Sequence, residues 1–414
     1  MRSIKTPREN LKAHIIGMCV KQKMTVKDAA KRLNLSERQI KNLKARYKEY
    51  GVSTMLHGNC GRQPAHTIPP EIKERILRIK EEPCYANVNF SHFCDDLNYE
   101  RGIQISYSAL RKLLTEHGIK SPKKHRAKRP EHNRRERKEQ FGEMLQTDAT
   151  PYPWFNVEEK YALHAMIDDA TGQLTGLYMS ENECAEGYFQ TLKQTISTHG
   201  IPQSIYADGL KLFFPMQKPT IEEQLEGKQW GSSQFGQIMK QLGSHLIHAR
   251  SPQAKGRVER LWDTLQSRLP VEFAKRGITS LSEANAFLQN EYVAQFNKRF
   301  GQKPQNESSG FMSRPKGIQL DTLLSIRYTR LVDNSGCFSL DNIVCQCNIP
   351  NILPKTKVEI LINLRLGVKV LYNGTMYSPT PILDKKKRQV TGSSVSSIIA
   401  QFVFDNCLKN EHSA

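Results

Sequence analysis

The sequence lacks the features that would place the chain in a membrane or in an oxidising compartment. No run of about 18 apolar residues occurs, and the N-terminal stretch MRSIKTPRENLKAH has no apolar core of the kind found in signal peptides. The nine cysteines are an odd number without a CxxC pair, which argues against a disulfide framework and a four-cysteine zinc site. We therefore expect a cytoplasmic protein without a membrane partner.

Acidic residues are scarce relative to basic ones. The chain has 41 Asp and Glu against 61 Lys and Arg, which leaves a formal net charge of +20. Such an excess indicates a polyanionic partner, with nucleic acid ahead of an anionic membrane surface, although charge that serves only solubility is the alternative. The 414 residues, 38% of them hydrophobic, are enough for roughly two to four domains with real cores.

The first 57 residues contain a helix-turn-helix pattern. Two short helical periodicities between residues 25 and 48 are broken at Asn34, and Thr25 and Ser36 stand where N-caps are expected. The second helix is predicted to enter a major groove of DNA, whereas a small bundle without a DNA role is the alternative. Its candidate DNA contacts are the basic residues Lys41, Lys44 and Arg46.

Residues 58–120 are predicted to form a second small helical module, of winged-helix or helix-turn-helix type, and residues 121–140 a basic linker. The stretch KKHRAKRPEHNRRERK in that linker repels itself when free and gains most beside phosphates, although a solvated linker is an equally good interpretation. The candidate DNA contacts there are Lys123, Lys124, Arg126, Lys128, Arg129, Arg134 and Arg135.

The periodicity changes from residue 141 onward. Three short alternating runs, then a helix, a strand, a second helix, a strand and a further helix predict the order βββαβαβα across residues 141–300. This order is typical of an α/β domain with a mixed five-stranded sheet flanked by helices. Residues 318–382 alternate around turn residues and predict a small β-barrel, and residues 383–414 predict a flexible basic and Ser-rich tail whose SIIAQFVF segment docks as a short element.

Three acids stand at corresponding places in this core. Asp148 ends the first predicted strand, Asp208 ends the fourth, and Glu259 lies one turn into the helix after the fifth. In a sheet whose first and fourth strands are neighbours these positions converge, and their mutual repulsion would be relieved by hard divalent cations. Taken alone, the helix with Glu259 and Asp263 on one face is better interpreted as a surface helix whose acids balance nearby bases.

The motifs around these acids, QTDAT, YADG and SPQAKGRVERLWDTLQ, resemble the catalytic core of DDE transposases with the retroviral-integrase, RNase H-like fold. PQAKGRVER in particular is similar to bacterial insertion-sequence transposases of the ISNCY-type group. The resemblance implies that Asp148, Asp208 and Glu259 bind two Mg²⁺ or Mn²⁺ ions. It also implies DNA contacts by the basic or polar residues of the last motif, which are Gln253, Lys255 and Arg257.

The resemblance implies a bacterial, nucleoid-associated DNA transposase. Such an enzyme binds terminal inverted repeats, cleaves and transfers strands, and works as a dimer or higher assembly on double-stranded DNA. The alternatives are an RNase H-like nuclease that does not join, and a DNA-binding repressor with an inactive core. Two features depart from the family pattern: the span of 51 positions from Asp208 to Glu259, which contains a polar insertion at residues 211–232, and the segment YADGLKLFF around the second acid. Asp168 and Asp169 are rivals for the metal role, and we interpret them as strand-end and turn residues.

Overall fold

The computed structural model describes residues 7–55, 67–122, 136–214, 231–249, 256–341 and 343–382, together with isolated positions at 221, 398–399 and 401–402. The chain divides into two compact units, residues 1–76 and residues 77–414. Within the described ranges, no helix is both long and apolar enough to cross a membrane.

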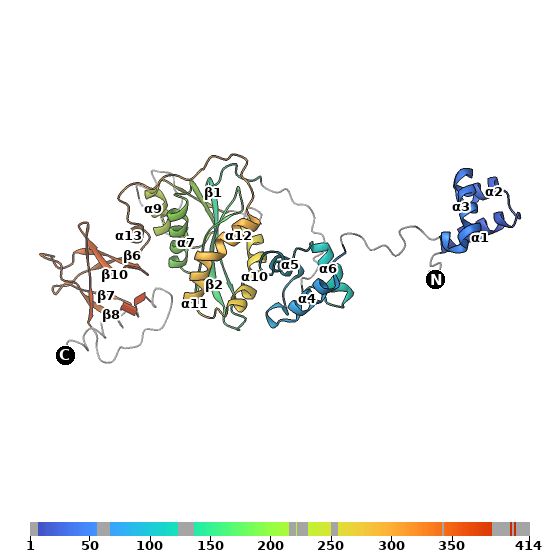
Figure 1. The fold of residues 1–414 in the computed structure, drawn as a ribbon. Coiled ribbons are helices and arrows are strands. Elements are labelled where there is room, and N and C mark those ends of the chain that lie inside the picture. The colour runs from blue at the N-terminus through green and yellow to red at the C-terminus, as the bar shows by residue number, and fades with distance from the viewer. Residues whose placement is uncertain are drawn as a thin grey trace. The chain divides into compact units, whose positions relative to one another are not determined.

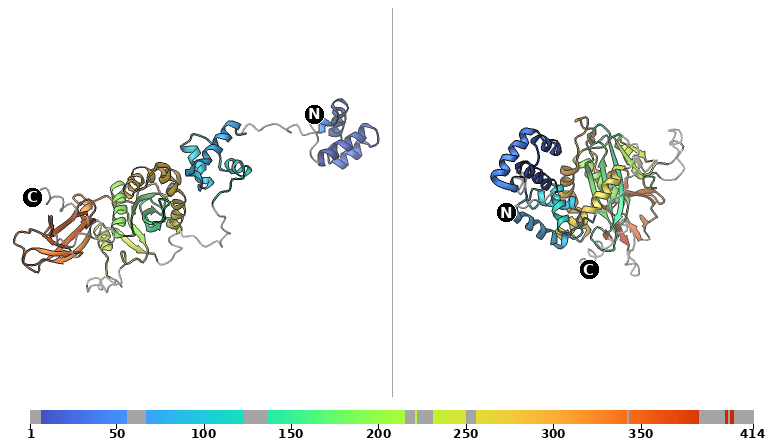
Figure 2. Two further views of the ribbon diagram at one scale, coloured as in Figure 1. Left: turned by 90° about the horizontal axis from the view of Figure 1, so that it is seen from below. Right: turned by 90° about the vertical axis from the view of Figure 1, so that its right-hand side faces the viewer.

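The N-terminal unit contains the predicted helix-turn-helix (blue in Figure 2). Its helices are α1 (Pro7–Val20), α2 (Val26–Leu33) and α3 (Glu37–Tyr50). Thr25 caps α2 and Ser36 forms a capping box with Gln39 at the start of α3, while Asn34 between them adopts the left-handed conformation with φ 51°. The helices pack around a small apolar core that includes the fully buried Ile40. The N-caps and the break at Asn34 predicted from sequence are therefore confirmed.

The second helical segment is formed by α4 (Pro70–Glu81), α5 (Phe90–Tyr99) and α6 (Tyr107–Glu116). Asn89 caps α5 and Ser106 caps α6, each by accepting a hydrogen bond from the backbone N–H three residues later. Residues 67–122 contain no strand, so this continuously described segment is helical and does not form a wing.

The central domain is built on a mixed five-stranded sheet (Figure 1). Its strands are β1 (Met144–Tyr152), β2 (Tyr161–Asp168), β3 (Leu174–Ser180), β4 (Ser204–Ala207) and β5 (His245–His248). They lie in the order β3-β2-β1-β4-β5, with β1 antiparallel to β2 and parallel to β4. The first and fourth strands are thus neighbours, which is the condition under which Asp148 and Asp208 converge.

Helices cover both faces of this sheet (Figure 1). On one face lie α7 (Ala185–Thr198) and α9 (Gln234–Gln241), and on the other lie α10 (Gly256–Arg276), α11 (Leu281–Phe287) and α12 (Val293–Phe300). In β1, Leu145 and Ala149 belong to the α7 and α9 side. Because side chains alternate along a strand, Gln146 and Asp148 point to the α10 side. This alternation decides which helix can meet the acid in β1.

The C-terminal domain departs from the predicted barrel. Its strands are β6 (Ile326–Leu331), β7 (Cys337–Leu340), β8 (Ile343–Gln346), β9 (Lys357–Asn363), β10 (Gly367–Tyr372), β11 (Thr375–Tyr377) and β12 (Thr380–Ile382), preceded by the short α13 (Leu320–Leu323). They form two sheets, β11-β10-β9-β6 and β12-β8-β7, so the hydrogen-bonded ladder is not closed among the described strands. The chain turns at residues 332–336 between β6 and β7, which are edge strands of the two sheets.

The C-terminal sheets share a hydrophobic core with α7 and α9 of the central domain. Ile398 and Ile399 from the predicted SIIAQFVF segment are also buried in that core, at 6% and 1% exposure. Part of the predicted flexible tail is therefore docked, because its apolar side chains find a shared core.

Candidate active site

Two of the predicted acids lie side by side at one edge of the central sheet. Asp148 is in β1, and Asp208 directly follows the end of β4 at Ala207. The two strands run parallel with Gln146 beside Tyr206, and continuing that register by two residues puts Asp208 beside Asp148. β1 continues to Tyr152, so Asp148 lies within the strand and not at its end as predicted from the sequence; the parallel register still brings both carboxylates to the place where β4 ends.

The first turn of α10 meets the same edge. The indole Nε1 of Trp262 donates a hydrogen bond to Oδ2 of Asp148 at 2.9 Å. Glu259 precedes Trp262 by three residues on the helix, so the two side chains leave neighbouring positions of α10. Glu259 itself is exposed to solvent. The helix that carries the third acid is therefore tied directly to the strand that carries the first.

Aromatic groups support the loop that follows Asp208. Oδ1 of Asp208 accepts a hydrogen bond from the backbone N–H of Leu210 at 3.2 Å, and this shapes the start of the loop. Farther along the loop, the ring of Phe213 meets the ring of Tyr188 edge-on, with the centroids 4.9 Å apart. Tyr188 is fully buried and belongs to α7. The packing thus holds the loop after Asp208 against α7, on the face of the sheet opposite α10.

The pKa of Tyr188 reflects the negative charge of the acids at the candidate active site. Burial and the neighbouring carboxylates of Glu183, Asp148 and Asp208 raise the pKa of the Tyr188 hydroxyl well above its usual value. That hydroxyl donates to Oε1 of Glu183 at 2.5 Å. Three acids therefore act on one phenol, as expected where negative charges crowd together.

His164 in β2 packs against Tyr188 and is neutral. Burial lowers the pKa of His164 to about 4. Its Nε2 accepts a hydrogen bond from the backbone N–H of Cys184, so its Nδ1 carries the proton toward the carbonyl oxygen of Tyr178. The His164 ring meets the Tyr188 ring edge-on at 4.8 Å. Sequence inspection passed over both residues because neither stands in a recognisable motif.

The donor chemistry of the three acids fits a hard divalent cation. Asp148, Asp208 and Glu259 offer carboxylate oxygens alone, the ligand type that Mg²⁺ and Mn²⁺ prefer over soft metals. Glu259 is exposed, so the edge can be reached from solvent. The negative charge sensed by Tyr188 is also what a bound cation would offset.

Asp168 and Asp169 have structural partners. Asp168 accepts hydrogen bonds from the backbone N–H of Gly142 and from both the N–H and the hydroxyl of Thr171. Asp169 accepts from Nε of Arg257 at 2.7 Å and from Nε2 of Gln146 at 2.9 Å. Both aspartates are fully buried. These contacts support the interpretation of the pair as strand-end and turn residues.

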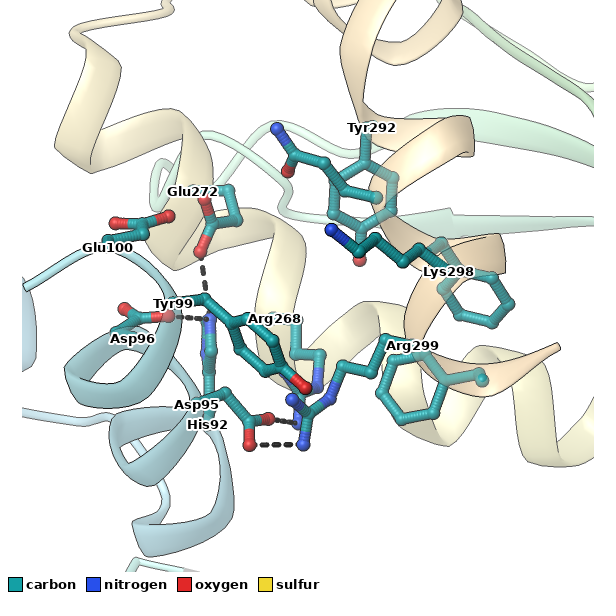
Figure 3. A pocket seen from close by; sticks show the side chains of 13 residues that line it. His92, Asp95, Asp96, Tyr99, Glu100, Arg268, Glu272, Tyr292, Lys298 and Arg299 are labelled. Atoms are coloured by element: carbon teal, nitrogen blue, oxygen red, sulfur yellow. Dashed lines mark hydrogen bonds and ion pairs between the residues drawn. The ribbon is translucent and has the colours of Figure 1, made fainter. Parts of the chain in front are cut away.

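A second cluster of charged side chains lies where α5 packs against α10 and α12, around a cavity of about 310 Å³ (Figure 3). His92, Asp96 and Glu272 have ligand atoms within 4.8 Å of one another, a spacing compatible with a metal ion. Lys275, however, already places its ammonium 2.8 Å from Asp96 and 3.5 Å from Glu272. An ammonium thus supplies the positive charge at this cluster, which holds two helices together.

The predicted DNA contacts fall into three groups. On α3, Lys41 and Arg46 are exposed and Lys44 is half-buried. On α10, the Arg257 guanidinium faces the buried Asp169. The remaining candidates lie outside the described residues; they are Lys123, Lys124, Arg126, Lys128, Arg129, Arg134, Arg135, Gln253 and Lys255.

Comparison with known proteins identifies the family. A helix-turn-helix domain model matches residues 11–63. The transposase for insertion sequence IS1202 of Streptococcus pneumoniae is 35% identical over 391 residues, covering 85% of this chain and 82% of the relative. Putative transposase y4bF of Sinorhizobium fredii is 30% identical over 338 residues, covering 81% of this chain and 71% of the relative. The chain belongs to this family of insertion-sequence transposases.

Solved structures with similar chains include viral integrases. The HTLV-2 integrase catalytic core domain in complex with magnesium is 18% identical and covers 39% of this chain and 89% of its own, with a TM-score of 0.28. The simian T-cell lymphotropic virus intasome in complex with the PP2A regulatory subunit B56 gamma is 12% identical and covers 74% and 96%, with a TM-score of 0.30.

Proposed function

We propose that this transposase binds the terminal inverted repeats of its element and catalyses cleavage and strand transfer at the edge formed by Asp148, Asp208 and Glu259. The observation that carries the proposal is that β1 lies parallel beside β4 and is tied to α10 by the hydrogen bond from Trp262 to Asp148. Family membership supports chemistry on DNA, and the three carboxylates are the proposed site for it.

In the proposed reaction, a water oxygen attacks the phosphorus at the element's end, the P–O3′ bond breaks, and the departing O3′ takes a proton. The freed 3′-hydroxyl then attacks a target phosphodiester and releases a target 3′-hydroxyl. Two Mg²⁺ or Mn²⁺ ions, when bound, would supply activation of the attacking oxygen and neutralisation of the leaving one. Asp148, Asp208 and Glu259 would hold these ions, while Trp262 keeps the Asp148 carboxylate oriented.

Binding to DNA ends is assigned to the N-terminal unit, with Lys41, Lys44 and Arg46 on α3 as contacts. Removal of residues 1–66 should abolish the preference for the terminal repeats and leave a weaker, salt-sensitive affinity for DNA. The basic segment at residues 123–138 would account for this remaining affinity, because such a segment binds phosphates without reading bases. Gel-shift titrations of both proteins with repeat and scrambled DNA at several salt concentrations test this. Equal preference for the repeat in the shortened protein would contradict the assignment.

Joining separates the proposal from its alternatives. With a pre-cleaved end and a second duplex, a transposase produces a joined product, a nuclease produces only shorter fragments, and a repressor produces neither. The assay uses the full chain with Mg²⁺ or Mn²⁺, and Asp148→Asn serves as the inactive control. Pairing of two ends further predicts a dimer or higher assembly on DNA, which the mass of the protein–DNA complex measures.

A further inference from the structure

The first turn of α10 is held to the sheet by a buried polar contact that begins two residues before Glu259. Nε of Arg257 donates to Oδ1 of Asp169 at 2.7 Å. The same Oδ1 accepts from Nε2 of Gln146 at 2.9 Å. Oε1 of Gln146 in turn accepts from the backbone N–H of Val258 at 3.4 Å. The three side chains therefore connect the strand of Asp148 to the helix of Glu259.

Every member of this connection is withdrawn from solvent. Asp169 and Gln146 are fully buried, and the side chain of Arg257 is 12% exposed. The other oxygen of Asp169 accepts from the backbone N–H of Lys138 at 2.9 Å, and the Asp169 N–H donates to the carbonyl of Met144 in β1. Backbone contacts thus hold the Asp169 carboxylate in the position in which it accepts the hydrogen bond from Arg257. Charge-assisted bonds between fixed, buried groups restrict orientation more than surface ion pairs do.

The place on β1 where this contact is made matters for the candidate active site. Gln146 and Asp148 project from the same face of β1, so Gln146 fixes the helix start one pleat away from the acid. Trp262 fixes the next turn of α10 by its bond to Asp148. Glu259 lies between these two attachment points. Two attachment points on either side of Glu259 restrict the rotation of the helix more than one attachment would.

We infer that Arg257, Asp169 and Gln146 act as positioning residues, which set the Glu259 carboxylate relative to Asp148 so that the acids can share a divalent cation. This inference rests on the proposed function. It assigns Arg257 to the support of the catalytic acids in place of the DNA contact predicted from sequence. Loss of groups that orient metal ligands generally weakens metal binding or activity about 10- to 100-fold.

The test is Mn²⁺ binding to the full chain, measured by calorimetry without DNA, with thermal unfolding recorded in parallel. Asp169→Asn and Arg257→Gln should each weaken Mn²⁺ binding about 10- to 100-fold. The double variant should be no worse than either single variant, because the residues act as one pair. Joining of pre-cleaved ends should require correspondingly more Mn²⁺, while binding to end DNA stays unchanged.

Asp168→Asn is the matched control. Asp168 neighbours Asp169, is equally buried, and accepts its hydrogen bonds from Gly142 and Thr171. It should lower the unfolding temperature but leave the Mn²⁺ affinity at the wild-type value. A role in folding alone would move both aspartate variants in the same way, with lower unfolding temperatures and unchanged Mn²⁺ affinity.

Arg257→Lys covers the case in which the charge-removing variants do not fold. It keeps the positive charge but loses the planar Nε donor, so it should fold and still bind Mn²⁺ more weakly than wild type. Wild-type Mn²⁺ affinity in a folded Arg257→Lys or Asp169→Asn protein would overturn the inference. Failure of the proposed function would look different, since wild type and Asp148→Asn would then bind Mn²⁺ equally and neither would join ends.

Discussion

Replacement of Glu259 by Gln tests the candidate active site most directly, because the side chain keeps its length and loses only its charge. Glu259 is exposed in the first turn of α10, so the substitution should leave the fold and the binding of end DNA intact. If the carboxylate holds a cation where charge develops in the transition state, its removal should cost at least about 3 kcal/mol. That loss corresponds to a drop of roughly 10²-fold or more in the rates of cleavage and joining.

The neighbouring acid on the same helix provides the control. Asp263 is also exposed and lies one turn beyond Glu259. Asp263→Asn removes an equal charge and should change stability by no more than about 0.5 kcal/mol, with little effect on the rates. The assay follows cleavage and joining of labelled end DNA in Mg²⁺ or Mn²⁺, with gel shifts in parallel. Near-normal joining by Glu259→Gln, or equal losses of joining rate in both variants, would refute the reasoning. Either result would favour the interpretation of α10 as an ordinary surface helix.

Three further predictions follow from the contacts. Trp262→Phe keeps the ring packing but removes the bond to Asp148, so it should slow joining several-fold at unchanged end binding, and an unchanged rate would contradict a role for that bond. The folded-state pKa of His164 lies below its unfolded value, so the unfolded chain binds more protons than the folded chain as the pH falls. The free energy of unfolding should therefore drop between pH about 6.5 and 4, by up to roughly 3 kcal/mol. Thermal unfolding of wild type and His164→Gln at several pH values measures this loss. Asp95→Asn removes the buried charge that pairs with Arg268 at 2.6 Å and with Arg299, and should lower the free energy of unfolding in urea by about 3 kcal/mol; a loss below about 1 kcal/mol would contradict this.

Local patterns in the sequence were sufficient for the elements and for the placement of the acids along them. Thr25 and Ser36 cap their helices because a hydroxyl at that position meets a free backbone N–H whatever the rest of the chain does. The alternating runs after residue 141 became β1, β2 and β3, and the apolar spacing after Gly256 became the buried side of α10, since both periodicities follow from backbone geometry.

The tertiary structure decided which side chains meet. Arg257 reads as one more basic residue in a basic chain, and its partner Asp169 is 88 positions away; Arg268 and Asp95 are 173 apart. The C-terminal strands were foreseeable from the sequence, but their division into two sheets was not. Pairings of this kind depend on strand register and on the packing of distant helices, and no local propensity encodes them. The sequence determined that three acids lie on or next to core elements, and the strand order β3-β2-β1-β4-β5 brought two of them to neighbouring strands, with the helix of the third tied to the first.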